Sequence, residues 1–112
     1  MVRLTLVRPD NGRSTSAMSI LKTKVVLTNG VIVEIKIWEM SRQSKQYPDG
    51  FKYSLYAVFC GKTLVGYDNH HPKGHHKHIG DEQLPYEFST LDKLKDDFRT
   101  DLKEQINREG LQ

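Results

Sequence analysis

Residues 21–37 decide the fold and read Leu-Lys-Thr-Lys-Val-Val-Leu-Thr-Asn-Gly-Val-Ile-Val-Glu-Ile-Lys-Ile. Apolar and polar residues alternate on both sides of Asn29-Gly30, which is the pattern of a β-hairpin. A three-residue loop ending at a left-handed Gly30 collects the apolar side chains on one face, whereas a two-residue turn mixes them with charged ones. Because a one-residue slip inverts every side chain, we predict the three-residue loop. It forms the pairs Leu27–Val31, Val25–Val33, Thr23–Ile35 and Leu21–Ile37.

Two more strands are predicted after this hairpin. The hairpin's second strand ends at Trp38, and a polar segment rich in turn residues follows it. Farther along, Gly61-Lys62 suits a two-residue type II′ turn, which pairs Tyr56 with Tyr67. The predicted elements are a loop over residues 40–50 and strands over residues 51–60 and 63–68.

The C-terminal segment has the spacing of an amphipathic helix. Ser89 is the expected N-cap, with Asp92 three residues on, and Gly110 is the expected stop. One apolar stripe follows the helical period, formed by Leu91, Leu94, Phe98, Leu102 and Ile106. The sequence therefore predicts an α+β fold, an antiparallel β-sheet of four or more strands covered by one C-terminal α-helix.

Length and composition favour one soluble domain. The 112 residues are 37% hydrophobic and 28% charged, which excludes a disordered chain, and no apolar run is long enough to span a bilayer. A single cysteine, Cys60, excludes an internal disulfide and favours the cytoplasm. We expect residues 18–112 to form the domain and residues 1–17 to be a mobile N-terminal extension. Pairing of residues 2–7 to a sheet edge is the alternative.

All five histidines fall within nine residues, at His70, His71, His75, His76 and His78. Pro72 and Gly74 indicate a structured turn inside this segment. If the chain is extended after that turn, His76 and His78 project from one side and Lys77 from the other. The segment follows the end of a strand, directly after Asp68-Asn69.

Histidines and lysines together suit several chemistries. RNA cleavage without a metal needs a base for the 2′-OH, an acid for the leaving oxygen and a cation beside the phosphate. His76 and His78, with Lys73 or Lys77, satisfy that need by residue type. Several histidines with Asp68 could instead bind a divalent metal, although the spacing matches no specific zinc signature.

Other interpretations stay open for the same residues. The loop could hold phosphates by charge alone, or it could be a solvated loop with local hydrogen bonds and no activity. Asp68-Asn69 is also the pattern of an Asx turn that ends a strand. Tyr53, Tyr56 and Tyr67 suit sheet packing better than base stacking.

The sequence resembles the TumE-like toxin family of type II toxin–antitoxin systems. The similarity covers residues 20–106, and the run of Asp-Asn followed by Lys-Gly and His-x-His is its most specific part. The matching segments are Val-Glu-Ile-Lys-Ile-Trp at 33–38, Lys-Tyr-Ser-Leu at 52–55, Val-Gly-Tyr-Asp-Asn at 65–69, Lys-Gly-His-His-Lys-His at 73–78, Pro-Tyr-Glu-Phe at 85–88 and Leu-x-x-Asp-Phe-x-x-Asp-Leu at 94–102.

The resemblance implies an endoribonuclease toxin that a helix-turn-helix antitoxin neutralises. We expect RNA as the substrate and no cofactor, and a sheet edge left by the short strands could support antitoxin docking or a homodimer. A binding module without catalysis and a metal-dependent nuclease with its metal at the histidine cluster are the alternatives. The expected catalytic residues are His76, His78 and Asp68, and the expected phosphate- or RNA-binding residues are Lys73, Lys77, Asn69 and Tyr67.

Overall fold

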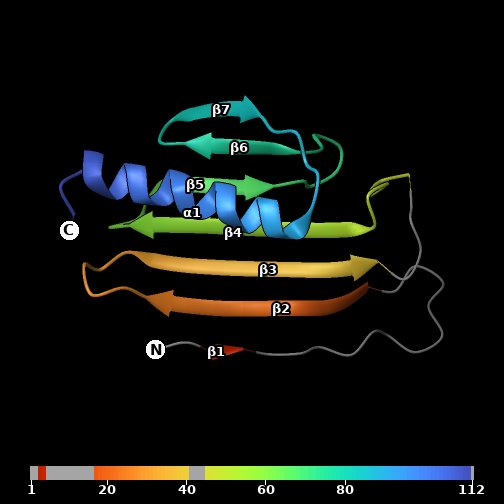
Figure 1. The fold of residues 1–112 in the computed structure, drawn as a ribbon, viewed down its shortest axis with the longest axis horizontal. Helices are drawn as coiled ribbons and strands as arrows, with labels where there is room; N and C mark the ends of the chain where they lie inside the picture. The colour runs from red at the N-terminus through yellow and green to blue at the C-terminus, as the bar shows by residue number, and fades with distance from the viewer. Residues whose placement is uncertain (1–2, 5–16, 41–44, 112) are drawn as a thin grey trace.

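The computed structural model describes residues 3–4, 17–40 and 45–111. These residues form one antiparallel sheet whose seven strands lie in chain order, with one helix packed on it (Figure 1). The predicted α+β class, with an antiparallel sheet and a C-terminal helix, is confirmed. The elements are β1 (Arg3–Leu4), β2 (Ala17–Val26), β3 (Ile32–Met40), β4 (Phe51–Phe59), β5 (Lys62–Asp68), β6 (His76–Ile79), β7 (Glu82–Pro85) and α1 (Leu91–Arg108).

The β2–β3 hairpin has the predicted three-residue loop. Val25 lies opposite Val33, and the Leu27 amide donates to the Val31 carbonyl at 2.8 Å. Gly30 has a φ of 90°, the left-handed conformation that the loop requires. Burial of one apolar face therefore set this register, as the alternation of residues 21–37 predicted.

The sheet extends farther at the other end of this hairpin than predicted. β3 ends at Met40 and not at Trp38, because β2 starts early enough for Ala17 to pair with Met40. At the outer edge, β1 pairs with β2, as the edge-pairing alternative for residues 2–7 anticipated. The rest of the predicted extension, residues 1–2 and 5–16, and part of the predicted loop, residues 41–44, lie outside the described residues.

The predicted register between β4 and β5 is wrong. The turn is formed by Cys60 and Gly61, both with positive φ, and not by Gly61-Lys62. This turn and a bulge in the strand pair place Gly66 opposite Tyr56, where Tyr67 was predicted. A Cβ atom at Gly66 would lie 2.2 Å from Cε1 of the Tyr56 ring. Glycine is thus the residue that leaves room for this ring.

The histidine segment contributes an additional hairpin. After the turn around Pro72, β6 pairs with β5, and β7 then returns alongside β6. Gly80 has a φ of 59° in the two-residue turn with Asp81 that joins them. This hairpin places the last histidines inside the sheet and not on a free loop.

Helix α1 covers one face of the sheet, where it packs on β5 and runs along β5 and β4 (Figure 1). Leu94 and Phe98 are its buried anchors, and Phe98 contacts the ring of Tyr67. The N-cap is Thr90 and not the predicted Ser89, because the extended Thr90 backbone lets its hydroxyl accept from the Lys93 amide at 3.1 Å. In the part of the chain that the structure describes, no helix has the length and apolarity to cross a bilayer.

The face of the sheet opposite α1 is called the open face here. Strand pairing aligns one row of residues across it, in the order Lys36, Ser54, Asp68 and His76. The next row contains Glu34, Tyr56, Gly66 and His78. The candidate site is built from these two rows.

Candidate active site

His76 and His78 lie side by side on the open face. Alternate residues of a strand point to the same side, and β6 presents both rings there. Their centroids are 5.1 Å apart, with the ring planes at 83°. The predicted projection of both rings from one side is confirmed.

Asp68 is the centre of the cluster, on the strand next to these histidines. Its Oδ1 lies 3.2 Å from Nε2 of His76 and also accepts from the His70 amide at 3.1 Å. Its Oδ2 accepts a hydrogen bond from the Tyr56 hydroxyl. The bond to His70 is the predicted Asx turn, so Asp68 both ends its strand and positions a histidine.

His76 has an oxygen acceptor at each ring nitrogen. Nδ1 lies 2.8 Å from the Gly74 carbonyl, which can only accept, so Nδ1 carries a proton. Nε2 lies 3.2 Å from the Asp68 carboxylate, which is an ion-pair distance when the ring is protonated. The side chain is only 8% exposed. The doubly protonated ring is the form that donates to the Gly74 carbonyl and places a positive charge beside Asp68.

His78 has the opposite character. Burial lowers its pKa below the usual 6.5, and the neighbouring His76 lowers that pKa further, while Asp68 raises it and Lys73 lowers it. The neutral ring is therefore favoured at physiological pH, which is the form that accepts a proton. Lys73 is exposed, and its positive charge lies near enough to the His78 ring to lower the pKa of that ring.

Tyr56 belongs to the cluster, although its place in a predicted strand favoured sheet packing. Its ring lies over Gly66 and 6.2 Å from the His78 ring, and its hydroxyl reaches Asp68. Burial raises the pKa of Tyr56, and the hydrogen bond to Asp68 raises it further, so the hydroxyl stays a donor. A glycine opposite an aromatic residue indicates that the ring folds over the neighbouring strand. The pairing of Gly66 with Tyr56 could be recognised only from the correct β4–β5 register.

Asn69, predicted to bind RNA, is bonded to the neighbouring strand. Its side chain accepts from the Tyr53 amide at 2.9 Å and donates to the Phe51 carbonyl at 2.8 Å. It is 3% exposed. These two bonds to β4 fix the direction in which the chain leaves β5, and they leave the side chain inside the fold.

Lys77 and Tyr67, also predicted to bind RNA, lie on the face that α1 covers. Lys77 Nζ is 3.2 Å from Asp101 of the helix and 5.6 Å from the centre of the Tyr67 ring. The Tyr67 hydroxyl donates to the same carboxylate, and the residue is fully buried. The structure therefore separates these two residues from the cluster by the thickness of the sheet.

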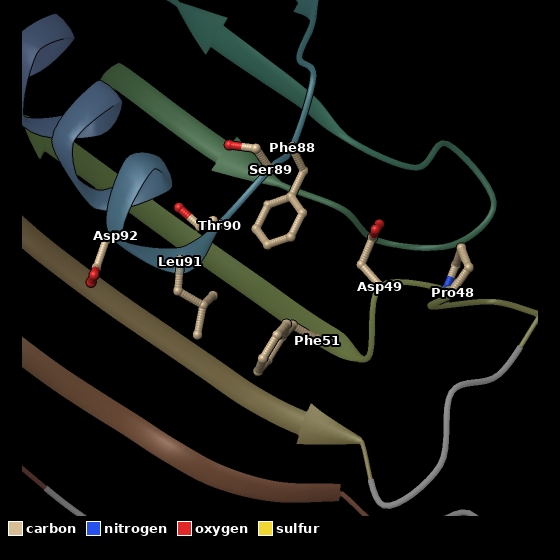
Figure 2. A pocket seen from close by; sticks show the side chains of 8 residues that line it. All are labelled: Pro48, Asp49, Phe51, Phe88, Ser89, Thr90, Leu91 and Asp92. Carbon is tan, nitrogen blue, oxygen red and sulfur yellow. The ribbon is translucent and has the colours of Figure 1, made fainter.

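His75 is bound in a different place. Its Nε2 lies 2.7 Å from Asp49, its Nδ1 lies 2.9 Å from the Tyr53 hydroxyl, and its ring stacks on Phe88 at 5.1 Å. Figure 2 shows Asp49 and Phe88 at a pocket of about 430 Å³ beside the start of α1. His75 thus ties the loop before β4 to the segment before the helix.

The cluster has the composition of a divalent metal site. Asp68, His76 and His78 each offer one ligand atom, and these atoms lie within 4.8 Å of one another. Nitrogen and carboxylate ligands of zinc lie about 2.0–2.2 Å from the metal, which separates tetrahedral ligands by roughly 3.3 Å. Small side-chain movements would bring the three groups to that spacing, so the residues fit a metal.

The comparisons with known proteins agree with the sequence resemblance. The model of a family described as Toxin TumE matches residues 5–106, which extends the predicted similarity toward the N-terminus. No curated protein and no solved structure matches the chain.

Proposed function

Because the chain belongs to the TumE toxin family, we propose that it is an endoribonuclease that cleaves RNA by acid–base chemistry. Membership of this family makes the protein a toxin of a toxin–antitoxin system, with an antitoxin as its partner. The adjacency of His76 and His78 carries the proposal of cleavage, since one ring favours the neutral form and the other is bonded as a donor. We further propose a helix-turn-helix antitoxin and messenger RNA in the cytoplasm as its target.

The two histidines have separate roles in the proposed reaction. Neutral His78 takes the proton from a 2′-OH, and the resulting oxygen attacks the adjacent phosphorus to form a 2′,3′-cyclic phosphate. His76 gives its Nε2 proton to the 5′ oxygen as the bond from phosphorus to that oxygen breaks. Nε2 is suited to this transfer because its 3.2 Å contact with Asp68 is longer than the 2.8 Å contact of Nδ1 with Gly74.

The surrounding residues support these two. Lys73 lies near His78 and supplies a cation for the phosphate. Asp68 positions His76, and Tyr56 in turn positions Asp68 by a hydrogen bond. We leave Lys77 and Tyr67 out of the proposed site because they contact Asp101 behind the sheet.

Purified protein is expected to cleave single-stranded RNA in the presence of EDTA, because the proposed reaction uses only side chains of the chain. The measurement is gel electrophoresis of a labelled RNA over time. RNA binding that weakens with salt and yields no product would contradict cleavage and support a binding module.

The pH dependence of cleavage should follow His78. Its lowered pKa means that the base stays neutral until the pH falls below 6.5, so the acidic limb of the profile of kcat/KM against pH should lie below that pH. Replacing Lys73 with alanine removes a charge that lowers this pKa, and the acidic limb should therefore move to higher pH. In the unchanged protein, an acidic limb centred above pH 6.5 would contradict the role of His78.

A metal-dependent nuclease is the second candidate, favoured by the convergence of Asp68, His76 and His78. A divalent ion held by these residues would act as a Lewis acid on the phosphate. EDTA would then abolish cleavage, and added zinc or manganese would restore it. The same EDTA experiment thus separates the two candidates.

A further inference from the structure

A second pocket opens on the open face, beside the cluster. Its volume is about 570 Å³, within the range of small-molecule sites. Its lining comes from β2, β3, β4, the loop before β4 and the segment after β5, and consists of Ala17, Trp38, Met40, Gln46, Tyr47, Lys52, His70 and His71. It is distinct from the pocket at the start of α1, with which it shares no lining residue.

The register places this pocket next to the proposed catalytic residues. Lys52 precedes Ser54 by two residues on β4, and Ser54 lies directly opposite Asp68. Two residues of a strand span about 7 Å and point to the same face. His70 likewise follows Asp68 by two residues and donates its amide to that carboxylate. The pocket therefore begins two residues along the strands from the row that contains Asp68, a distance of about 7 Å.

The lining has the chemistry of a nucleotide site. Trp38 lies opposite Lys52 in the sheet, and Lys52 Nζ lies over one face of the indole ring, 5.4 Å from its centre, which leaves the other face for a base. An aromatic ring next to basic side chains is the arrangement by which proteins stack a base and hold its phosphate. His70 and His71 also line the pocket, and both are exposed.

We propose that this pocket binds the base of the nucleotide that adjoins the cleaved phosphate. Trp38 stacks on the base, and Lys52 contacts the neighbouring phosphate. The position relative to the cleaved bond rests on the proposed function, whereas binding of a nucleobase does not. The pocket then determines which base stands next to the cut.

Fluorescence of Trp38 tests this directly, because it is the protein's single tryptophan. The probes are the four nucleoside 5′-monophosphates, with ribose 5-phosphate as the control for the phosphate alone. We expect saturable quenching by at least one nucleotide and a much weaker response to ribose 5-phosphate. Equal responses to both probes, or no quenching by any nucleotide, would overturn the proposal.

Variants separate stacking from charge. Calorimetry should show that Trp38→Ala weakens nucleotide binding on the order of 10- to 100-fold, with a smaller loss for Trp38→Phe, which keeps an aromatic face. Lys52→Ala should weaken all four nucleotides uniformly. Lys62→Ala is the matched control, because Lys62 is an exposed lysine next to the β4–β5 turn. An equal effect of Lys52→Ala and Lys62→Ala would count against the pocket.

The outcome also distinguishes this inference from the proposed function. The titration needs no cleavage and can be repeated with His78→Ala. Nucleotide quenching without any RNA cleavage would overturn the proposed reaction and leave the base pocket in place. Cleavage of RNA without nucleotide quenching would overturn the base pocket and leave the proposed reaction in place.

Discussion

Replacing His78 with alanine is expected to slow RNA cleavage by about 10²- to 10⁴-fold, the usual contribution of a general base. The reason is that burial and the neighbouring His76 lower the pKa of His78, which favours a neutral, proton-accepting ring 5.1 Å from the His76 ring. His76→Ala should cause a loss of the same order, because the leaving oxygen then has no proton donor. Single-turnover rates at saturating RNA measure the chemical step without the effect of binding.

A histidine outside the cluster provides the control. His70 lies in the same segment, but its contact with Asp68 is made by its backbone amide and survives substitution. His70→Ala should therefore keep the single-turnover rate at saturating RNA and change only the RNA concentration needed to reach it. Equal rates for His78→Ala and the unchanged protein would refute the assignment of the base.

Gly66→Ala is expected to destabilise the fold by about 1–3 kcal/mol or more, although it adds a single methyl group. The new Cβ would lie 2.2 Å from Cε1 of Tyr56, and an aromatic ring cannot bend out of the way. The ring must swing off β5, which also breaks its hydrogen bond to Asp68. Urea denaturation measures the loss of stability, and the cleavage rate should fall with it.

A double-mutant cycle isolates this contact. If the Tyr56 ring is the obstacle, Gly66→Ala should cost far less stability in a chain that already carries Tyr56→Ala. A similar cost in both backgrounds would show that the glycine is needed for another reason.

The parts of the fold that the sequence predicted were those with a single buried face. The register of residues 21–37 followed because only one loop length gathers the apolar side chains, and α1 followed from its stripe. The β4–β5 register could not be predicted in this way, because both faces of these strands carry large side chains. There the Cys60-Gly61 turn and the space above Gly66 decided the pairing.

The site was predicted in part for a similar reason. Strand alternation alone puts His76 and His78 on one side, and the Asp68 contact depends on the next strand. Tyr56 was missed because the wrong β4–β5 register paired it with Tyr67. The short β6–β7 hairpin was not predicted, because its strands show little apolar alternation. Its turn, Gly80-Asp81, was the signal that the sequence did offer.

The two faces of the sheet explain why neighbouring residues have different roles. Lys77 stands between the two histidines in sequence, yet it contacts Asp101 of α1 on the opposite face. The dense run of charge from residue 73 to 78 is thus divided by the strand. One part holds the helix, and the other forms the proposed active site.

The chemical ends of the RNA fragments test the central claim most directly. A defined single-stranded RNA is incubated with the protein in EDTA, and the masses of the fragments are measured by mass spectrometry. Attack by the 2′-OH, with His78 as base and His76 as acid, predicts a 2′,3′-cyclic phosphate on one fragment and a 5′-hydroxyl on the other. Fragments with a 3′-hydroxyl and a 5′-phosphate would contradict this mechanism, because water and not the 2′-OH would then be the attacking group.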